Sequence, residues 1–223
     1  MRRMAGLTAA MLAATVGLQA DLSTKEVNRI KAAATVLREI HRVPDKDIPR
    51  QLWDSASCVI VVPSLKKAAF VFGGEYGNGL MSCRLHGAWS APVFIQIGKG
   101  SWGLQIGAQS IDLVLLVMNE SGMSKLLGNK VSLGAEASVA AGPVGRDARA
   151  ATDAQLKAEI LSYSRTQGLF AGIDLTGGVM KPDVDDNHDL YGENVEPREV
   201  LTTGTQAPAV ARPFMEALAS EGK

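Results

Sequence analysis

The chain has 223 residues, of which 46% are hydrophobic, so it is long enough to bury a substantial core. Its 23 basic and 23 acidic residues give a formal net charge of zero, which excludes a global electrostatic field that would favour nucleic acid or an acidic polymer. The 23 glycines indicate many tight turns. We therefore expect a glycine-rich globular domain that does not bind nucleic acid.

The first 20 residues have the layout of a secretory signal peptide. Arg2 and Arg3 form a short positive region, the apolar run "AGLTAAMLAATVGL" follows, and Ala20 ends the segment with a small side chain. The run is too short and too rich in alanine to span a bilayer comfortably, so cleavage is favoured over an uncleaved anchor. We expect a signal peptide over residues 1–20, one mature domain over residues 21–223, and a periplasmic or secreted location.

The clearest predicted helix covers about residues 24–42. Ser23 and Glu26 have the spacing of a capping box, and Pro44 ends the helical pattern. The apolar positions on one arc of this helix are Val27, Ile30, Ala33, Ala34, Leu37 and Ile40. The cations that flank this arc are Lys25, Arg29, Lys31, Arg38 and Arg42. Such a helix can lie in a bilayer interface with its cations at the headgroups, or it can pack on its own domain, and both alternatives stay open.

From Cys58 onward the sequence consists of short apolar runs separated by glycine, which is typical of strands. The runs include "CVIVV", "GLMSCRLH", "APVFIQI" and "IDLVLLVM", and a short helix is expected at "ESGMSKLLG". The segment "APAVARPFMEALASE" predicts a closing helix. We expect an α+β fold with a β-rich, antiparallel, barrel-like core over about residues 57–192, an N-terminal amphipathic helix and a short C-terminal helix.

Both cysteines, Cys58 and Cys83, lie in strand-like segments that are close in sequence. An exported protein with two cysteines can form one disulfide bond, whereas two buried thiols would act as small hydrophobic side chains. The oxidising compartment favours the bond.

The stretch from Gly98 to Gly103 spells G-x-G-x-x-G, the pattern of dinucleotide-binding proteins. In those proteins a helix begins at the third glycine, but the residues after Gly103 are strand-like. We therefore expect a hairpin with its tip at Lys99 and Gly100, and no cofactor. No nucleophile, zinc or phosphate-loop motif is present, so the sequence predicts a non-enzymatic protein.

The segment "DVDDNHDLYGEN" places oxygen-bearing side chains at alternate positions, as in a calcium loop. These positions are Asp183, Asp185, Asn187 and Asp189. However, His188 stands where such a loop needs glycine, and Asn194 stands where it needs glutamate. A solvated acidic loop is the preferred interpretation, and the sequence predicts no metal site.

Several segments together resemble the SYLF domain, a lipid-binding family of bacterial exported proteins and of eukaryotic proteins in membrane and actin traffic. They include "GGEYGNGL", "WSAP", "GLQIGAQSIDLVLLVMN", "LGAEASVAAGPVGR" and "SYSRTQGLFAG", and they cover nearly all the mature chain in order. The resemblance implies a domain that binds phospholipid and has no catalytic activity. In eukaryotic members phosphoinositide binding is attributed to a basic amphipathic helix at the start of the domain, which corresponds here to residues 24–42.

We therefore expect a phospholipid-binding protein of the bacterial cell envelope that contacts anionic lipid, or a membrane surface, through the N-terminal helix. The alternative is a structural or interaction protein of the periplasm, whose β-surface or acidic loop binds a protein partner. Six further residues lie in the matched segments, either as a ligand site or as braces of the fold: Arg84, Trp89, Asp112, Arg146, Tyr163 and Arg165.

Overall fold

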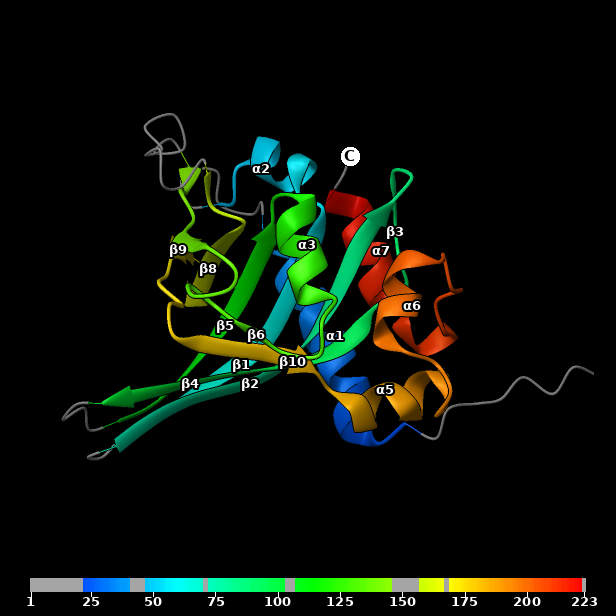
Figure 1. Ribbon diagram of the computed structural model, residues 1–223, viewed down its shortest axis with the longest axis horizontal. Helices are drawn as coiled ribbons and strands as arrows, with labels where there is room; N and C mark the ends of the chain where they lie inside the picture. Colours follow the sequence, from blue (N-terminus) through cyan, green and yellow to red (C-terminus); the bar gives the residue numbers. More distant parts are fainter. Residues whose placement is uncertain are drawn as a thin grey trace, which may run out of the picture.

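The computed structural model describes residues 22–40, 47–69, 72–102, 107–145, 157–166 and 169–221. The predicted signal peptide lies outside these residues. The described chain forms a curled, half-barrel-like sheet with helices on both faces, which confirms the predicted α+β class (Figure 1). The hydrogen-bonded order is β6-β10-β4-β2-β1-β5-β8-β7, with β3 paired to β2 and β9 paired to β8.

The four longest strands form the centre of the sheet and extend beyond the helices as a twisted arm (Figure 1). They are β1 (Cys58–Ala69), β2 (Phe72–Leu85), β4 (Val93–Trp102) and β5 (Gly107–Val117). The shorter strands are β3 (Ala88–Trp89), β6 (Val131–Ser132), β7 (Val139–Ala141), β8 (Ile160–Thr166), β9 (Leu169–Gly172) and β10 (Gly178–Pro182). Every strand pairing is antiparallel except that of β7 with β8.

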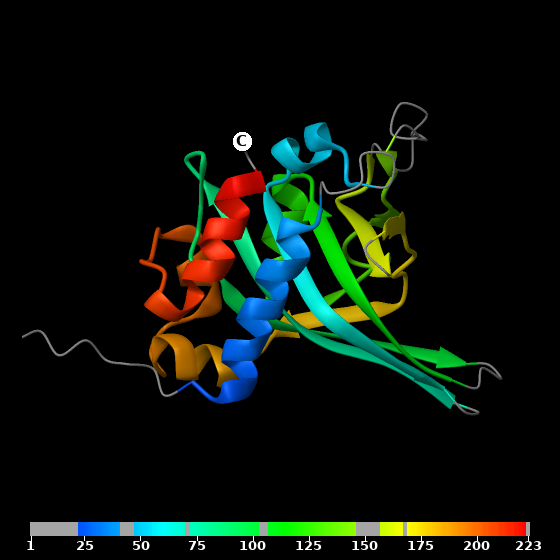
Figure 2. The same cartoon turned by 180° about the vertical axis from the view of Figure 1, so that it is seen from behind.

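The helices divide between the two faces of the sheet. Helices α1 (Thr24–Arg38) and α7 (Arg212–Glu221) pack against each other on one face, as Figure 2 shows from behind. On the other face lie α3 (Glu120–Leu126) and α6 (Pro197–Thr202), and α5 (Val184–Tyr191) lies at the end of β10 (Figure 1). The remaining elements are α2 (Arg50–Ser55) and the short 3-10 helix η2 (Ala209–Ala211).

The central strands are buried on both faces, which explains their nearly continuous apolar sequences. In β1, Val59 and Val61 belong to the core cluster that contains α1 and α7. Their neighbours Ile60 and Val62 belong to the cluster on the opposite face, because successive side chains of a strand alternate. The sheet therefore separates two cores, one under α1 and α7 and one under α3 and α6.

Gly98 and Gly100 of the glycine motif belong to a strand and not to the turn that the sequence suggested, and Gly103 lies outside the described residues. Lys99 and Gly100 lie inside β4, opposite Glu75 and Gly74 of β2. Strands β4 and β5 are not hydrogen-bonded neighbours, because β2 and β1 lie between them. The predicted hairpin at Lys99 and Gly100 is therefore wrong. The expectation of a strand after the motif is confirmed, since β5 begins at Gly107.

Two other predicted segments differ from the structure. Helix α1 ends at Arg38 with Glu39 as its C-cap, whereas the sequence suggested an end near residue 42. The acidic segment predicted to be a solvated loop is the helix α5. Four elements were not anticipated: α2, α6, β3 and β10.

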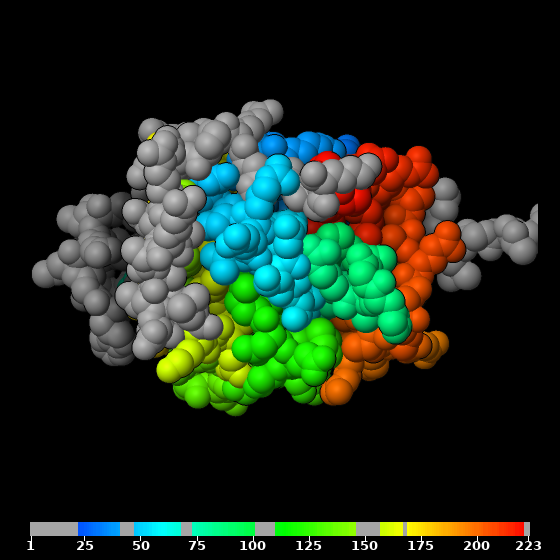
Figure 3. Space-filling view, turned by 90° about the horizontal axis from the view of Figure 1, so that it is seen from above, coloured from blue at the N-terminus to red at the C-terminus, as the bar shows by residue number. Residues whose placement is uncertain are grey.

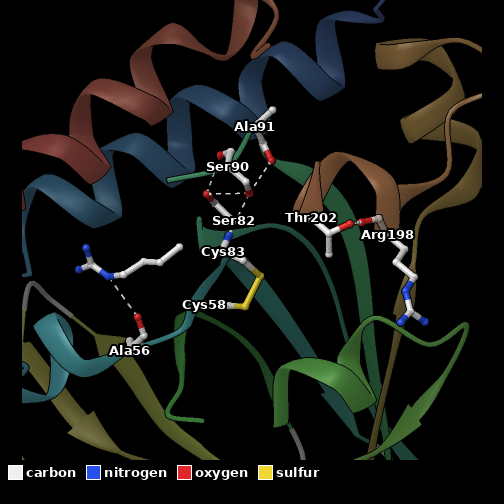
Figure 4. The surroundings of a disulfide bond; sticks show 9 residues. Ala56, Cys58, Ser82, Cys83, Ser90, Ala91, Arg198 and Thr202 are labelled. Carbon is white, nitrogen blue, oxygen red and sulfur yellow. Dashed lines mark hydrogen bonds between the residues drawn. A yellow bond between two sulfur atoms is a disulfide. The ribbon is translucent and has the colours of Figure 1, made fainter. Parts of the chain in front are cut away.

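The register of β1 on β2 places Cys58 directly opposite Cys83, and a disulfide bond joins them (Figure 4). Next to it, the Cys83 N–H donates to Ser90 Oγ, and Ser82 Oγ donates to the Ser90 carbonyl at 2.7 Å. The two sulfurs are fully buried in the core under α3 and α6.

We expect the purified, denatured protein to show no titratable thiol until reductant is added. Changing Cys58 and Cys83 together to alanine should lower the free energy of unfolding by about 3 kcal/mol, because the bond closes a loop with a sequence separation of 25 residues. Urea unfolding of the wild type with and without reductant should give the same difference. Two free thiols in the unreduced protein would contradict the prediction.

Candidate functional site

Helix α1 begins at the predicted cap. Glu26 accepts hydrogen bonds from the Ser23 N–H at 2.7 Å and from Ser23 Oγ at 2.8 Å. The apolar arc of α1 then faces the sheet: Ile30, Leu37 and Ile40 are fully buried in the core. Of the two alternatives that the sequence left open, the structure therefore shows the helix packed on its own domain, and these three side chains do not face solvent. Val27 is half-buried.

The five cations predicted around this arc do not form one surface. Lys25, Lys31 and Arg38 are exposed, and Arg38 Nη2 lies 3.4 Å from the Pro213 carbonyl at the start of α7. Arg29 is buried and acts as a structural residue. Arg42 lies outside the described residues.

Arg29 joins α1 to α5 and to the sheet. Its Nη1 lies 2.5 Å from Asp186 Oδ2 and 3.7 Å from Asp183 Oδ2, and its guanidinium carbon lies 4.9 Å from the centre of the Phe94 ring. Burial raises the pKa of Asp183, and the neighbouring Asp186 raises it further. The cation therefore neutralises two carboxylates that the fold holds close together.

An open groove of about 400 Å³ lies between the exposed side of α1 and the strands β1 and β2. We call it the basic groove, because Lys25 and Arg29 of α1 and Lys66 of β1 line it. The other lining residues are Asn28, Ala32, Pro63, Ser64, Tyr76, Gly77 and Asn78. Tyr76 is 51% exposed, so its ring is available at the surface. The helix side of this groove was predicted from the sequence, and the strand side was not.

The floor of the basic groove is a bulge in β1. The register of β1 shifts between Val62 and Leu65, and Ser64 has a φ of 60°. A Cβ at Gly77 would lie 2.5 Å from Val62 Cγ1, so β2 needs glycine where it approaches the bulge. The Pro63-Ser64 pair inside an apolar run was the sequence signal for this irregularity.

A charged cluster holds the bulge in place. The Ser64 N–H donates to Asp112 Oδ1 at 2.9 Å, and Arg165 donates to Asp112 Oδ2 at 2.6 and 2.8 Å. Arg165 also forms an ion pair with Glu39 at the end of α1. Burial raises the pKa of Asp112, and the Ser64 hydrogen bond opposes this effect. Asp112 and Arg165 therefore brace the wall of the groove.

Two other residues from the matched segments are also braces. Arg84 Nε donates to the Ala56 carbonyl at 3.1 Å, and its guanidinium lies 4.2 Å from the centre of the Trp89 ring. The Trp89 ring lies 6.0 Å from that of Trp53. These contacts hold α2 against the turn between β2 and β3. Seen from above in Figure 3, α2 and this turn lie next to each other.

Tyr163 is fully buried, and its hydroxyl has no hydrogen-bond partner among the described residues. Burial raises the pKa of Tyr163. Arg146 lies outside the described residues.

A second charged cluster ties α3 to β8. Lys125 Nζ lies 2.7 Å from Glu159 Oε1, and the Ser138 N–H donates to Glu159 Oε2 at 2.9 Å. The hydrogen bonds from Lys125 and Ser121 lower the pKa of Glu159 to about 2. Glu159 is therefore a fixed anion that joins three segments of the fold.

The residues considered for calcium do not converge. Asp183 is the N-cap of α5, and Asp185, Asn187 and Asp189 lie within this helix, so helical spacing directs their side chains to different sides. The Asn187 amide is buried, donates to the Phe94 carbonyl at 2.8 Å and accepts from the Phe94 N–H at 2.8 Å. Within the described ranges, no three metal-binding side chains gather at one point.

None of the helices in the described part of the chain combines the length and the hydropathy needed to cross a bilayer.

The fold and the groove define an α+β half-barrel domain with a cationic concavity beside its N-terminal helix. The model of the Ysc84 family, described as "Las17-binding protein actin regulator", matches residues 98–221. The chain therefore belongs to the Ysc84 family, the SYLF domain family that the motifs indicated. The family description and the names of the relatives refer to binding, regulation and domain content, and not to a catalysed reaction.

Three curated relatives from eukaryotes are similar to the chain. The chain is 36% identical over 179 residues to SH3 domain-containing protein PJ696.02 of Schizosaccharomyces pombe; the aligned region covers 78% of this chain and 41% of that protein. It is 31% identical over 197 residues to SH3 domain-containing YSC84-like protein 1 of Homo sapiens, with coverage of 85% and 57%. For protein YSC84 of Saccharomyces cerevisiae the identity is 29% over 214 residues, with coverage of 92% and 46%. The chain thus spans about half the length of the curated relatives it matches.

Proposed function

We propose that this domain is a non-enzymatic module that binds the headgroups of anionic phospholipid at a membrane surface. The observation that carries the proposal is the basic groove, which brings Lys25 of α1 and Lys66 of β1 to one concave surface beside the exposed Tyr76. The proposal differs from insertion of an apolar helix face, because the apolar arc of α1 is already used in the core.

The chemistry of the groove suits a phosphate-bearing headgroup. Among the described residues, neither Lys25 nor Lys66 forms a salt bridge, so both ammonium groups are free to meet an anion. Exposed tyrosine rings are favoured at the boundary between headgroups and acyl chains. Each cation near an anionic surface contributes about 1 kcal/mol and is screened by salt, so a few cations support reversible binding.

We further propose that the protein acts at the bacterial cell envelope, after export. The support is the signal-like sequence of residues 1–20 and the buried disulfide bond, since such bonds persist in oxidising compartments. A second candidate function is binding of a protein partner, favoured by the family description of a Las17-binding actin regulator.

We expect the purified protein to co-sediment with vesicles that contain anionic phospholipid, and to co-sediment poorly with neutral vesicles. Changing Lys25 and Lys66 together to glutamine should remove about 2 kcal/mol of attraction, which corresponds to roughly 30-fold weaker binding. Raising the salt concentration should weaken the binding of the wild type, because screening shortens the range of the attraction.

The matched control changes Lys130 and Lys181 together to glutamine. Both side chains are exposed, and both lie at the β6–β10 edge of the sheet, so this variant alters the net charge equally without touching the groove. Equal losses in the two double variants would mean that net charge governs binding and not the groove. If the wild type does not bind anionic vesicles, the proposed lipid function is wrong and binding of a protein partner is favoured.

A further inference from the structure

A second cavity, of about 460 Å³, lies on the sheet face opposite to α1. It is enclosed by α3, α5 and α6 over the strands β2 and β4. The buried apolar side chains that line it are Met81, Val93, Ile95, Leu126 and Leu201, each at most 8% exposed. Its size falls in the range of about 300–1,000 Å³ that is usual for sites of small ligands, and an apolar interior is their common feature. We call it the chain cavity.

Among the described residues that line the chain cavity, the charged side chains lie at its rim. Glu193 and Glu196 come from the connection between α5 and α6, and Arg198 comes from α6. All three are exposed, and no salt bridge joins any of them to a described residue. Figure 4 shows the Arg198 side chain extending away from the disulfide bond. The rim thus offers one free cation and two free anions beside an apolar interior.

The rest of the rim is also suited to an amphiphilic ligand. Val184 is 53% exposed at the start of α5, which is unusual for an aliphatic side chain and extends the apolar surface towards solvent. His188 lies one helical turn further along α5 and adds a polar group on the same side. A ligand with an alkyl chain and a compact polar head would therefore meet apolar groups inside and polar groups outside.

We propose that the chain cavity binds one molecule of a zwitterionic lysophospholipid. The alkyl chain lies on the apolar floor, where its methylene groups are removed from water. The phosphate faces Arg198, and the ammonium group faces Glu193 and Glu196. A free fatty acid presents a carboxylate to these two glutamates, and a simple alkylammonium leaves Arg198 without a partner, so both complement the rim less well.

This site is independent of the basic groove and does not rest on the proposed vesicle binding. The two sites lie on opposite faces of the sheet, since the groove borders α1 and the chain cavity borders α3 and α6. The groove faces headgroups of an assembled membrane, whereas the chain cavity takes a lipid monomer out of water.

Isothermal titration calorimetry tests the proposal with the purified protein and short-chain lysophosphatidylcholine, kept below its critical micelle concentration. We expect saturable binding at one site per chain. Lysophosphatidylglycerol of the same chain length carries the phosphate but no ammonium group, and we expect it to bind about tenfold more weakly. No saturable binding of lysophosphatidylcholine, or equal affinity for the two lipids, would overturn the proposal.

Variants locate the site. Val184→Trp places a large side chain at the exposed mouth, where it does not disturb the core, and should reduce the affinity for lysophosphatidylcholine at least about tenfold. Changing Glu193 and Glu196 together to glutamine should abolish the preference over lysophosphatidylglycerol and retain the circular dichroism spectrum. The variant with Lys25 and Lys66 changed to glutamine should bind lysophosphatidylcholine like the wild type. Unchanged affinity in the Val184→Trp variant would place the lipid elsewhere.

Discussion

Replacing Arg29 by alanine is expected to lower the free energy of unfolding by about 3–5 kcal/mol, the range found when one partner of a buried ion pair is removed. Arg29 is 7% exposed and is the cation that faces Asp186 at 2.5 Å and Asp183 at 3.7 Å. Without it, the buried carboxylate of Asp183 and the half-buried carboxylate of Asp186 lie beside each other with no cation between them. Urea unfolding at neutral pH measures the loss.

The loss of unfolding free energy in the Arg29→Ala variant should be smaller at low pH than at neutral pH. In the Arg29→Ala variant Asp183 loses the cation that favours its charged form, so its pKa in the folded state, already raised by burial, rises further above that in the unfolded state. The folded variant then binds more protons than the unfolded chain, and its stability falls as the pH rises through the folded pKa of Asp183. The deficit relative to the wild type should therefore shrink as the pH is lowered towards about 4.

Two controls separate this pair from a general effect of charge on α1. Lys31→Ala removes an exposed cation from the same helix and should change stability by no more than about 0.5 kcal/mol. Adding Asp186→Asn to Arg29→Ala should recover part of the loss, because one stranded charge is removed. A pH-independent loss that Asp186→Asn does not reduce would mean that Arg29 stabilises the fold through packing alone.

The sequence predicted the parts of the fold that local pattern determines. The runs around Val59 and Leu115 are apolar at every position because both faces of β1 and β5 are buried, so they were recognisable as strands. The cap at Ser23 and Glu26 depends on residues three positions apart, and it was found as well. Strand order depends on pairing between distant segments, which is why β4 and β5 were joined wrongly into a hairpin.

The acidic helix and the candidate site were predicted less completely. Asn187 and Asp183 looked like residues of a loop. The contacts that hold them in place come from distant residues: Phe94, which is 93 residues from Asn187, and Arg29 of α1. The cations of α1 were identified, but periodicity did not separate the buried Arg29 from the exposed Lys25. Lys66 was missed, because only the folded sheet brings it beside α1.

Leu37→Ala is the second change for which we expect a large effect. Leu37 is fully buried in the core cluster shared by α1, α7 and the sheet, so the substitution should lower the free energy of unfolding by about 2–5 kcal/mol. Leu37→Met keeps nearly the same volume and should cost less than about 1.5 kcal/mol. Thermal or urea unfolding, followed by circular dichroism, measures both values.

Leu37→Ala, compared with the variant in which Lys25 and Lys66 are glutamine, also decides how α1 meets a membrane. If lipid binds in the basic groove, folded Leu37→Ala protein should bind anionic vesicles as tightly as the wild type, since Leu37 does not line the groove. If α1 instead leaves the domain and inserts its apolar arc into the bilayer, the arc loses buried apolar area in lipid, and binding should weaken by about 2 kcal/mol, or roughly 30-fold. Vesicle binding measured below the unfolding temperature of the variant distinguishes the two outcomes. Weakened binding by Leu37→Ala, with normal binding by the variant in which Lys25 and Lys66 are glutamine, would mean that the inserted helix α1, and not the basic groove, contacts the membrane.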